Sequence, residues 1–105
     1  MSLMPLARGS GGDAVSTGHG CDATTVTDQC SPNVFVNGKG VVRYSDLDQS
    51  HLVPFGICVP HAVPLTTFEN DYSFTVFANG KNIARKGDKY SGEEIITGSS
   101  NVNCG

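Results

Sequence analysis

The chain has 105 residues, of which 38% are hydrophobic and 13 are glycine, and it contains no tryptophan. A single small domain of this composition has a thin core and often needs a metal, a disulfide or a partner surface to hold it. The net charge is −3 and the 7 lysine and arginine residues are scattered, which argues against a nucleic-acid-binding surface. No stretch approaches the roughly 18 apolar residues of a spanning helix. We expect one domain over residues 1–105, with residues 1–4 a leader or a disordered start.

Two short runs of β-forming residues, 33–36 and 74–77, lead into Asn-Gly pairs. Asn-Gly is the strongest short-range hairpin signal, because both residues tolerate the positive φ of a type I′ turn. The sequence therefore predicts two β-hairpins, with returning strands at residues 40–43 and 82–85. No helical periodicity extends over two turns, so the predicted class is all-β.

The two predicted hairpins are copies of each other. Residues 34–39 (VFVNGK) match residues 76–81 (VFANGK), and an Arg-x-x-Asp follows each copy at residues 43–46 and 85–88. We interpret this repeated Arg-x-x-Asp as a tie between the repeats.

The two ends of the chain carry a third, split copy. Residues 7–8 resemble residues 84–85, and residues 98–103 (GSSNVN) resemble residues 31–36 (SPNVFV). A chain whose termini share one repeat indicates a closed, roughly threefold arrangement, because an open array needs more repeats and polar caps.

The predicted hairpin strands are apolar on both faces, although so small a protein has room for only one face in its core. The other face is either an exposed interaction surface or is covered by the connectors. If Val36 and Val76 point outward, Phe35 and Phe77 point into the core.

Two long connectors rich in turn-forming residues, 9–30 and 44–70, separate the repeats, and connectors of this length are usually functional. They hold all three histidines of the chain, which are His19, His51 and His61. Cys58 lies three residues before His61. Three imidazoles and one thiolate complete the tetrahedral set of a structural Zn²⁺ site.

The remaining cysteines leave alternatives open. The start of the chain lacks a basic region followed by an apolar run, so we expect synthesis in a reducing cytosol, where cysteines bind metal more often than they pair. Cys21 and Cys104 are rival thiolate ligands to Cys58. A Cys21–Cys30 disulfide is a further alternative.

Catalytic patterns are weak. The sequence has no His-Glu-x-x-His pair, phosphate-binding glycine loop or Gly-x-Ser-x-Gly elbow. A metallohydrolase needs an open metal position and a base such as Asp22 or Asp48, and a closed four-ligand site excludes that chemistry. Residues 93–94 (Glu-Glu) are interpreted as a solvated edge. We therefore expect a non-enzymatic protein.

The repeated unit resembles a known family. Residues 31–39 (SPNVFVNGK), 76–88 (VFANGKNIARKGD) and 95–102 (IITGSSNV) are similar to PAAR-repeat proteins, and the resemblance covers nearly the whole chain. The eponymous Pro-Ala-Ala-Arg is only partly kept, at residues 5–8 (PLAR) and 82–85 (NIAR). The resemblance implies a small cone of β-hairpins with pseudo-threefold symmetry, long turn-rich connectors and a metal near the apex.

PAAR-repeat proteins bind their metal, usually zinc, through three histidines and one cysteine. Carried over by position, the implied ligands are His19, His51, Cys58 and His61, with zinc expected and iron as the alternative. Ser91 stands where many relatives have cysteine, and this departure favours Cys58 as the thiolate.

The resemblance also implies a function. Members of this family sit, one per trimer, on a trimeric β-helical spike of contractile phage tails and type VI secretion systems. We expect a structural tip of the virion tail that pierces the bacterial outer membrane and binds no nucleic acid. The alternatives are secretion with a type VI spike and a metal-binding adaptor that attaches cargo or an effector to the spike.

Overall fold

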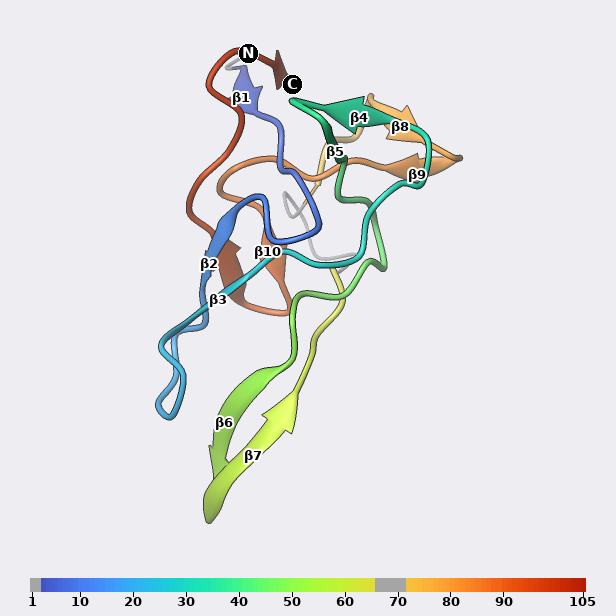
Figure 1. The fold of residues 1–105 in the computed structure, drawn as a ribbon. Helices are drawn as coiled ribbons and strands as arrows, with labels where there is room; N and C mark the ends of the chain where they lie inside the picture. The colour runs from blue at the N-terminus through green and yellow to red at the C-terminus, as the bar shows by residue number, and fades with distance from the viewer. Residues whose placement is uncertain (1–2, 66–71) are drawn as a thin grey trace.

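The computed structural model describes residues 3–65 and 72–105, and within these ranges the chain forms strands and no helix. The all-β prediction is confirmed. The molecule measures 41 × 26 × 24 Å along its principal axes. The β-hairpin formed by β6 (His51–Phe55) and β7 (Ile57–His61) projects at one end, and both chain termini lie at the other (Figure 1). Across the described ranges, no helix is long and apolar enough to cross a bilayer.

Three two-stranded antiparallel sheets lie at the end that carries the termini (Figure 1). These are β1 (Met4–Pro5) with β12 (Asn103–Cys104), β4 (Phe35–Val36) with β5 (Lys39–Gly40), and β8 (Phe77–Ala78) with β9 (Lys81–Asn82). In the first of them, strands from opposite ends of the chain pair with each other. We call this end of the molecule the base.

A four-stranded antiparallel sheet lies between the base and the projecting hairpin (Figure 1). Its order is β10 (Lys89–Tyr90), β11 (Glu93–Ile95), β2 (Ala14–Ser16) and β3 (Thr24–Val26). It joins a segment near the N-terminus to the last third of the chain, so the middle of the molecule depends on contacts distant in sequence.

The two predicted hairpins turn at the expected Asn-Gly pairs. Asn37 and Gly38 have φ values of 53° and 79°, and Asn79 and Gly80 have 55° and 75°. Positive φ at both central residues is the geometry that favours Asn-Gly. The returning strands are shorter than predicted, because residues 41, 43, 83 and 85 form isolated bridges with other repeats.

The three copies of the repeat meet through their backbones. The Val42 N–H donates to the Ala7 carbonyl, the Ala84 N–H to the Val42 carbonyl and the Ala7 N–H to the Ala84 carbonyl, at 3.2, 2.8 and 3.0 Å. All three residues are completely buried. These hydrogen bonds join the split copy at the chain ends to the two internal copies in a closed ring.

Each Arg-x-x-Asp closes a turn. Arg43 lies 2.9 Å from the Asp46 carboxylate and Arg85 lies 2.8 Å from that of Asp88. Arg8 makes the same contact with Asp13 at 2.8 Å. The aspartates also accept the backbone N–H of their arginines, so each ion pair braces its own loop. The Arg43 guanidinium donates in addition to Asn79 Oδ1 of the other copy at 3.1 Å, so the predicted tie between repeats is present at Arg43.

Serine hydroxyl groups also form hydrogen bonds from one repeat to another. Ser31 donates to Asn79 Oδ1 and Ser99 donates to Asn37 Oδ1, both at 2.6 Å. The Ser73 hydroxyl donates to the carbonyl oxygen of Gly105, which stands where the third copy would have its asparagine. Each copy of the repeat is therefore hydrogen-bonded to another copy through its serine.

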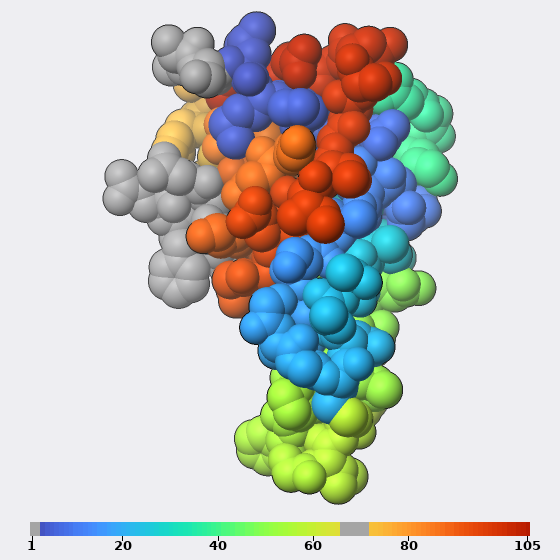
Figure 2. Space-filling model, turned by 90° about the vertical axis from the view of Figure 1, so that its left-hand side faces the viewer, coloured from blue at the N-terminus to red at the C-terminus, as the bar shows by residue number. Residues whose placement is uncertain are grey.

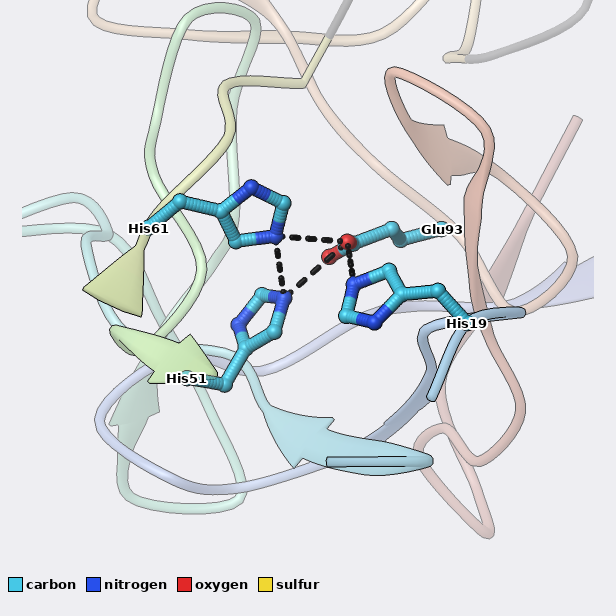
Figure 3. A group of neighbouring side chains, drawn as sticks. All are labelled: His19, His51, His61 and Glu93. Carbon is cyan, nitrogen blue, oxygen red and sulfur yellow. Dashed lines mark hydrogen bonds and ion pairs between the residues drawn. The ribbon is translucent and has the colours of Figure 1, made fainter. Parts of the chain in front are cut away.

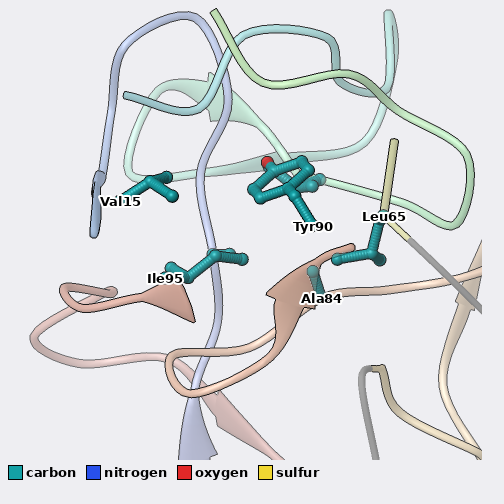
Figure 4. Close-up of a cluster of buried hydrophobic side chains, with 7 residues drawn as sticks. Val15, Leu65, Ala84, Tyr90 and Ile95 are labelled. Atoms are coloured by element: carbon teal, nitrogen blue, oxygen red, sulfur yellow. The ribbon is translucent and has the colours of Figure 1, made fainter. Parts of the chain in front are cut away.

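The core consists of two small clusters. One surrounds the fully buried Tyr90 ring (Figure 4), and its members are Ala7, Val15, Val42, Leu65, Ala84, Tyr90 and Ile95. The other lies under the base and contains Leu6, Val36, Val41, Ala78 and Ile83. Neither cluster reaches the projecting hairpin, whose stability must come from elsewhere.

The hairpin strands take the opposite of the orientation considered from the sequence, in which the valines point outward and the phenylalanines inward. Val36 is buried and Val76 packs against the core under the base, whereas Phe35 and Phe77 are 60% and 56% exposed. Strand alternation places neighbours on opposite faces, and the buried neighbours of Phe35 and Phe77 are Val36 and Ala78. The base thus presents phenylalanine rings to the outside.

Candidate metal centre

Three side chains from two connectors converge at the root of the projecting hairpin. His51 opens β6 and His61 ends β7, and the two residues stand directly opposite each other in the antiparallel register. Directly opposite residues project from the same face of a hairpin, within contact distance. His19 reaches the same place from the loop between β2 and β3, so the structure brings together all three expected histidines (Figure 3).

The fourth member of the group is Glu93, on β11. Its Oε2 atom lies 2.9 Å from Nε2 of His19, 3.0 Å from Nε2 of His51 and 3.1 Å from Nε2 of His61. The four ligand atoms lie within 4.8 Å of one another (Figure 3). Tetrahedral zinc with bonds of about 2.0–2.1 Å sets its ligand atoms about 3.4 Å apart, so this group has the dimensions of a metal site.

Outer hydrogen bonds orient two of the rings. Nδ1 of His19 lies 2.9 Å from the Gly20 carbonyl, and Nδ1 of His51 lies 2.8 Å from the Gln49 carbonyl. Because a carbonyl only accepts, each Nδ1 carries the hydrogen and Nε2 of the neutral ring presents its lone pair. Metal-binding histidines are typically held by such a bond from the other ring nitrogen.

These lone pairs face other acceptors. Nε2 of His61 lies only 2.7 Å from Nε2 of His51, and the Glu93 carboxylate faces both rings. Three protonated rings would repel at this distance, and three neutral rings would leave lone pairs opposed to a carboxylate. A cation between the four groups satisfies all of them, so the donor set fits a metal ion.

The site is largely shielded from solvent. The side chains of His51 and Glu93 are 2% and 5% exposed, and those of His19 and His61 are 19% and 29% exposed. Burial alone would raise the pKa of Glu93, but hydrogen bonds with Asp48, His51 and His19 outweigh it and hold this pKa below its ordinary value. Glu93 is therefore a carboxylate at neutral pH, as a metal ligand must be.

Asp48 stands behind Glu93. Burial, together with a hydrogen bond and charge repulsion from Glu93, raises the pKa of Asp48 to about 8. Asp48 Oδ2 and Glu93 Oε1 have no conventional donor among the described residues, and one proton shared between the two carboxyl groups satisfies both. The raised pKa favours the protonated form of Asp48, which can donate a hydrogen bond to Glu93.

Burial lowers the pKa of His51, but the Gln49 carbonyl, Glu93 and Asp48 more than offset this effect, and the net shift is upward. A raised pKa means that the surroundings favour positive charge at this ring. The field of the site therefore suits a cation.

Cys58, the expected thiolate ligand, lies outside this group. It forms a disulfide with Cys21, with the two Cα atoms 5.9 Å apart. The short Cys-x-x-His spacing suggests chelation from a turn, but residues 57–61 form a strand. On a strand, side chains three residues apart point to opposite faces, so Cys58 turns away from the His61 site.

The other cysteines also take different places from those considered. Cys21 pairs with Cys58 and not with Cys30, and it joins the His19 loop to the projecting hairpin. Cys30 and Cys104 are free and half-buried. Neither belongs to the metal-ligand group among the described residues.

Glu93 is the residue that sequence reasoning missed. The interpretation of residues 93–94 as a solvated edge holds for Glu94, which is exposed, and fails for Glu93, which is 4% exposed. The signal was present in the strand period of two: Glu93 shares a face with Ile95, which is completely buried.

No protein-family model matches this chain, and no curated protein matches it either. The structure is an all-β domain with a largely shielded group of side chains that could hold a metal ion. The members of this group are His19, His51, His61 and Glu93.

Proposed function

We propose that this protein is a metal-stapled tip that seats, one copy at a time, on the end of a trimeric β-helical spike of a contractile injection machine. The observation that carries this proposal is the separation of two features. Exposed phenylalanine rings lie on two of the three similar small sheets at the base, and a compact metal-ligand group lies toward the opposite, projecting end.

Pseudo-threefold symmetry is the first part of the proposal. It is supported by the closed ring of backbone hydrogen bonds among Ala7, Val42 and Ala84. The equivalent registers of the sheets at the base support it too. One chain with three similar edges can sit on three identical chains, because each edge meets an equivalent surface.

The base is the proposed contact with the spike. Phe35, Phe77, Phe74 and Val34 are 60%, 56%, 55% and 40% exposed. Clustered exposed apolar side chains mark interaction surfaces. The third sheet has Asn103 where the others have Phe35 and Phe77, so the base is not equally apolar on its three sides.

The metal is the proposed cross-link of the projecting, conical end of the molecule. Zinc is the expected ion and iron is the alternative. His19, His51, His61 and Glu93 would hold it, and nitrogen and carboxylate ligands suit either ion. Bound there, the ion supplies structural cross-linking. Four protein ligands complete the tetrahedron of a structural zinc ion, which accords with a non-enzymatic role.

The proposed setting is a virion tail, with a type VI spike as the alternative, and the bacterial outer membrane as the transient contact. A tip that is pushed through a barrier must not buckle. The disulfide and the metal-ligand group both lie where the hydrophobic clusters do not reach, and this placement supports a mechanical role.

Co-purification with a trimeric β-helical spike from the same genome tests the proposal. We expect one tip per trimer by light scattering. Phe35→Asp and Phe77→Asp should weaken the complex at least about tenfold, because each places a charge in an apolar contact. Ile96→Asp, at an exposed apolar residue outside the base sheets, should leave the complex unchanged. Three tips per trimer, or no association with any such spike, would contradict the proposal and leave the adaptor function ahead.

A further inference from the structure

The far end of the projecting hairpin is apolar in every side chain. Residues 52–60 read Leu-Val-Pro-Phe-Gly-Ile-Cys-Val-Pro, without a charge, hydroxyl or amide among them. Phe55 and Ile57 flank Gly56 at the turn and are 84% and 74% exposed. No other large hydrophobic side chain in the described ranges is as exposed as these two. We call residues 55–57 the apex.

The backbone of this hairpin is also adapted to an apolar medium. In an antiparallel pair, alternate residue pairs point their N–H groups outward. Pro54 pairs with Cys58 and Leu52 with Pro60, and because proline cannot donate, these are the outward-pointing pairs. Two of the four outward N–H groups are therefore missing.

A third outward N–H is covered. The Leu52 N–H donates to Asp22 Oδ2 at 2.7 Å, and the Asp22 N–H donates back to the Leu52 carbonyl at 3.2 Å. Among these four positions, only Cys58 keeps an uncovered donor. Unpaired backbone donors are part of what makes an open sheet edge costly in hydrocarbon, and this hairpin has few outward N–H groups, although the outward carbonyl groups of its prolines and Cys58 remain.

The apex stands on a rigid stem. The Cys21–Cys58 disulfide ties β7 to the His19 loop, and the His51–His61 pair with Glu93 holds the root of the hairpin. Gly56 at the turn lies two residues beyond Pro54, which is about 7 Å at roughly 3.3 Å per residue. Interfacial anchors enter a bilayer to a depth of about 5–10 Å, which matches this length.

The shape of the apex and its apolar composition indicate what kind of partner it contacts. The apex projects from the narrow end of the molecule (Figure 2), so it is a convex point and has no walls to grip a peptide. Residues 52–60 also lack any charge or side-chain donor with which to choose a particular protein surface. A bilayer interior accepts such a point without specific partners.

We propose that the apex inserts into the hydrocarbon of a lipid bilayer, with Phe55 and Ile57 as the leading side chains. The inference rests on the proposed function only in taking the hairpin as the leading end of the tip. The attraction is apolar, so it does not depend on the charge of the lipid headgroup.

The chain contains no tryptophan, which provides a single-site probe. In the full-length, oxidised, metal-loaded protein, Phe55→Trp should shift its emission to shorter wavelength with phosphatidylcholine vesicles. Brominated acyl chains should quench it. Phe77→Trp, at the opposite end, should show neither effect. Unchanged Phe55→Trp emission, or an equal response from Phe77→Trp, would overturn the proposal.

Binding strength gives a second measurement. The double variant Phe55→Ser/Ile57→Ser should lower the vesicle partition coefficient at least about tenfold, because two large apolar side chains no longer leave water. Ile96→Ser should not change it, and neutral and partly anionic vesicles should give the same result. Equal binding by wild type and the double variant would overturn the proposal.

Failure here can be distinguished from failure of the proposed function. A protein that binds one spike trimer but no vesicle of any composition would support the capping function and contradict insertion into a bilayer. The exposed apex would then be a contact site for a protein. Vesicle binding without spike binding would support insertion of the apex into a bilayer and would contradict the proposed function as a spike cap.

Discussion

The base and the projecting hairpin differ in what holds them together. The base has three similar sheets, a closed ring of backbone hydrogen bonds and a small hydrophobic cluster. The hairpin has none of these; four converging side chains hold its root, and one disulfide ties β7 to the His19 loop. Repetition stabilises one end, and specific cross-links stabilise the other.

This difference follows from the size of the domain. Three interlocked copies can bury their backbones against one another, but a hairpin that projects beyond them has no neighbour to pack against. Small domains with thin cores commonly rely on metals or disulfides for this purpose. The comparison predicts that changes at the two ends affect different measurements.

The largest expected effect is the loss of the proposed metal ligand Glu93. The purified protein should carry about one transition metal ion per chain, and Glu93→Gln should lower its affinity by more than about a hundredfold, beyond the usual effect of an outer-shell change. Structural zinc contributes on the order of 10 kcal/mol, so the melting temperature should fall sharply. Elemental analysis measures the metal content and calorimetry measures the melting temperature.

Glu94→Gln is the matched control on the exposed face of the same strand and should change neither value. Metal-free protein with unchanged heat stability would refute the staple.

A smaller effect is expected from the core, and it separates inward from outward side chains. Ile95→Ala should lower the free energy of unfolding by about 2–5 kcal/mol, because it leaves a cavity beside Tyr90. Phe77→Ala should change it by less than about 0.5 kcal/mol, because that ring is exposed. Urea unfolding with a constant m-value measures both. A larger cost at Phe77 than at Ile95 would mean that the phenylalanine rings face the core.

The smallest effect is expected from the disulfide. Cys21→Ser and Cys58→Ser should each destabilise the oxidised protein by about 2–4 kcal/mol, and by similar amounts, because either one opens the same cross-link. The metal content should stay near that of the wild type, and Cys30→Ser should have little effect on either quantity. Thermal unfolding and metal analysis of the variants provide the measurement. If Cys58→Ser abolishes metal binding and Cys21→Ser is harmless, the Cys58 thiolate is a ligand after all.

Local sequence signals identified the all-β class and the two turns, because Asn-Gly acts through the φ preferences of two adjacent residues. The repeats at 34–39 and 76–81 also pointed to equivalent hairpins, which the structure contains as β4–β5 and β8–β9. Histidine content together with connector length selected His19, His51 and His61. Each of these signals is carried by residue type and close spacing.

Only the tertiary structure decided the fourth member of the metal-ligand group and the partner of Cys58. Glu93 meets His19 across 74 positions, and Cys58 meets Cys21 across 37. The direction of a side chain depends on whether its segment is a turn or a strand. Cys58 faces away from His61 because residues 57–61 are extended, and Glu93 faces inward with Ile95 for the same reason. Spacing along the chain determined which residues could meet, and strand alternation with long-range pairing determined which of them do.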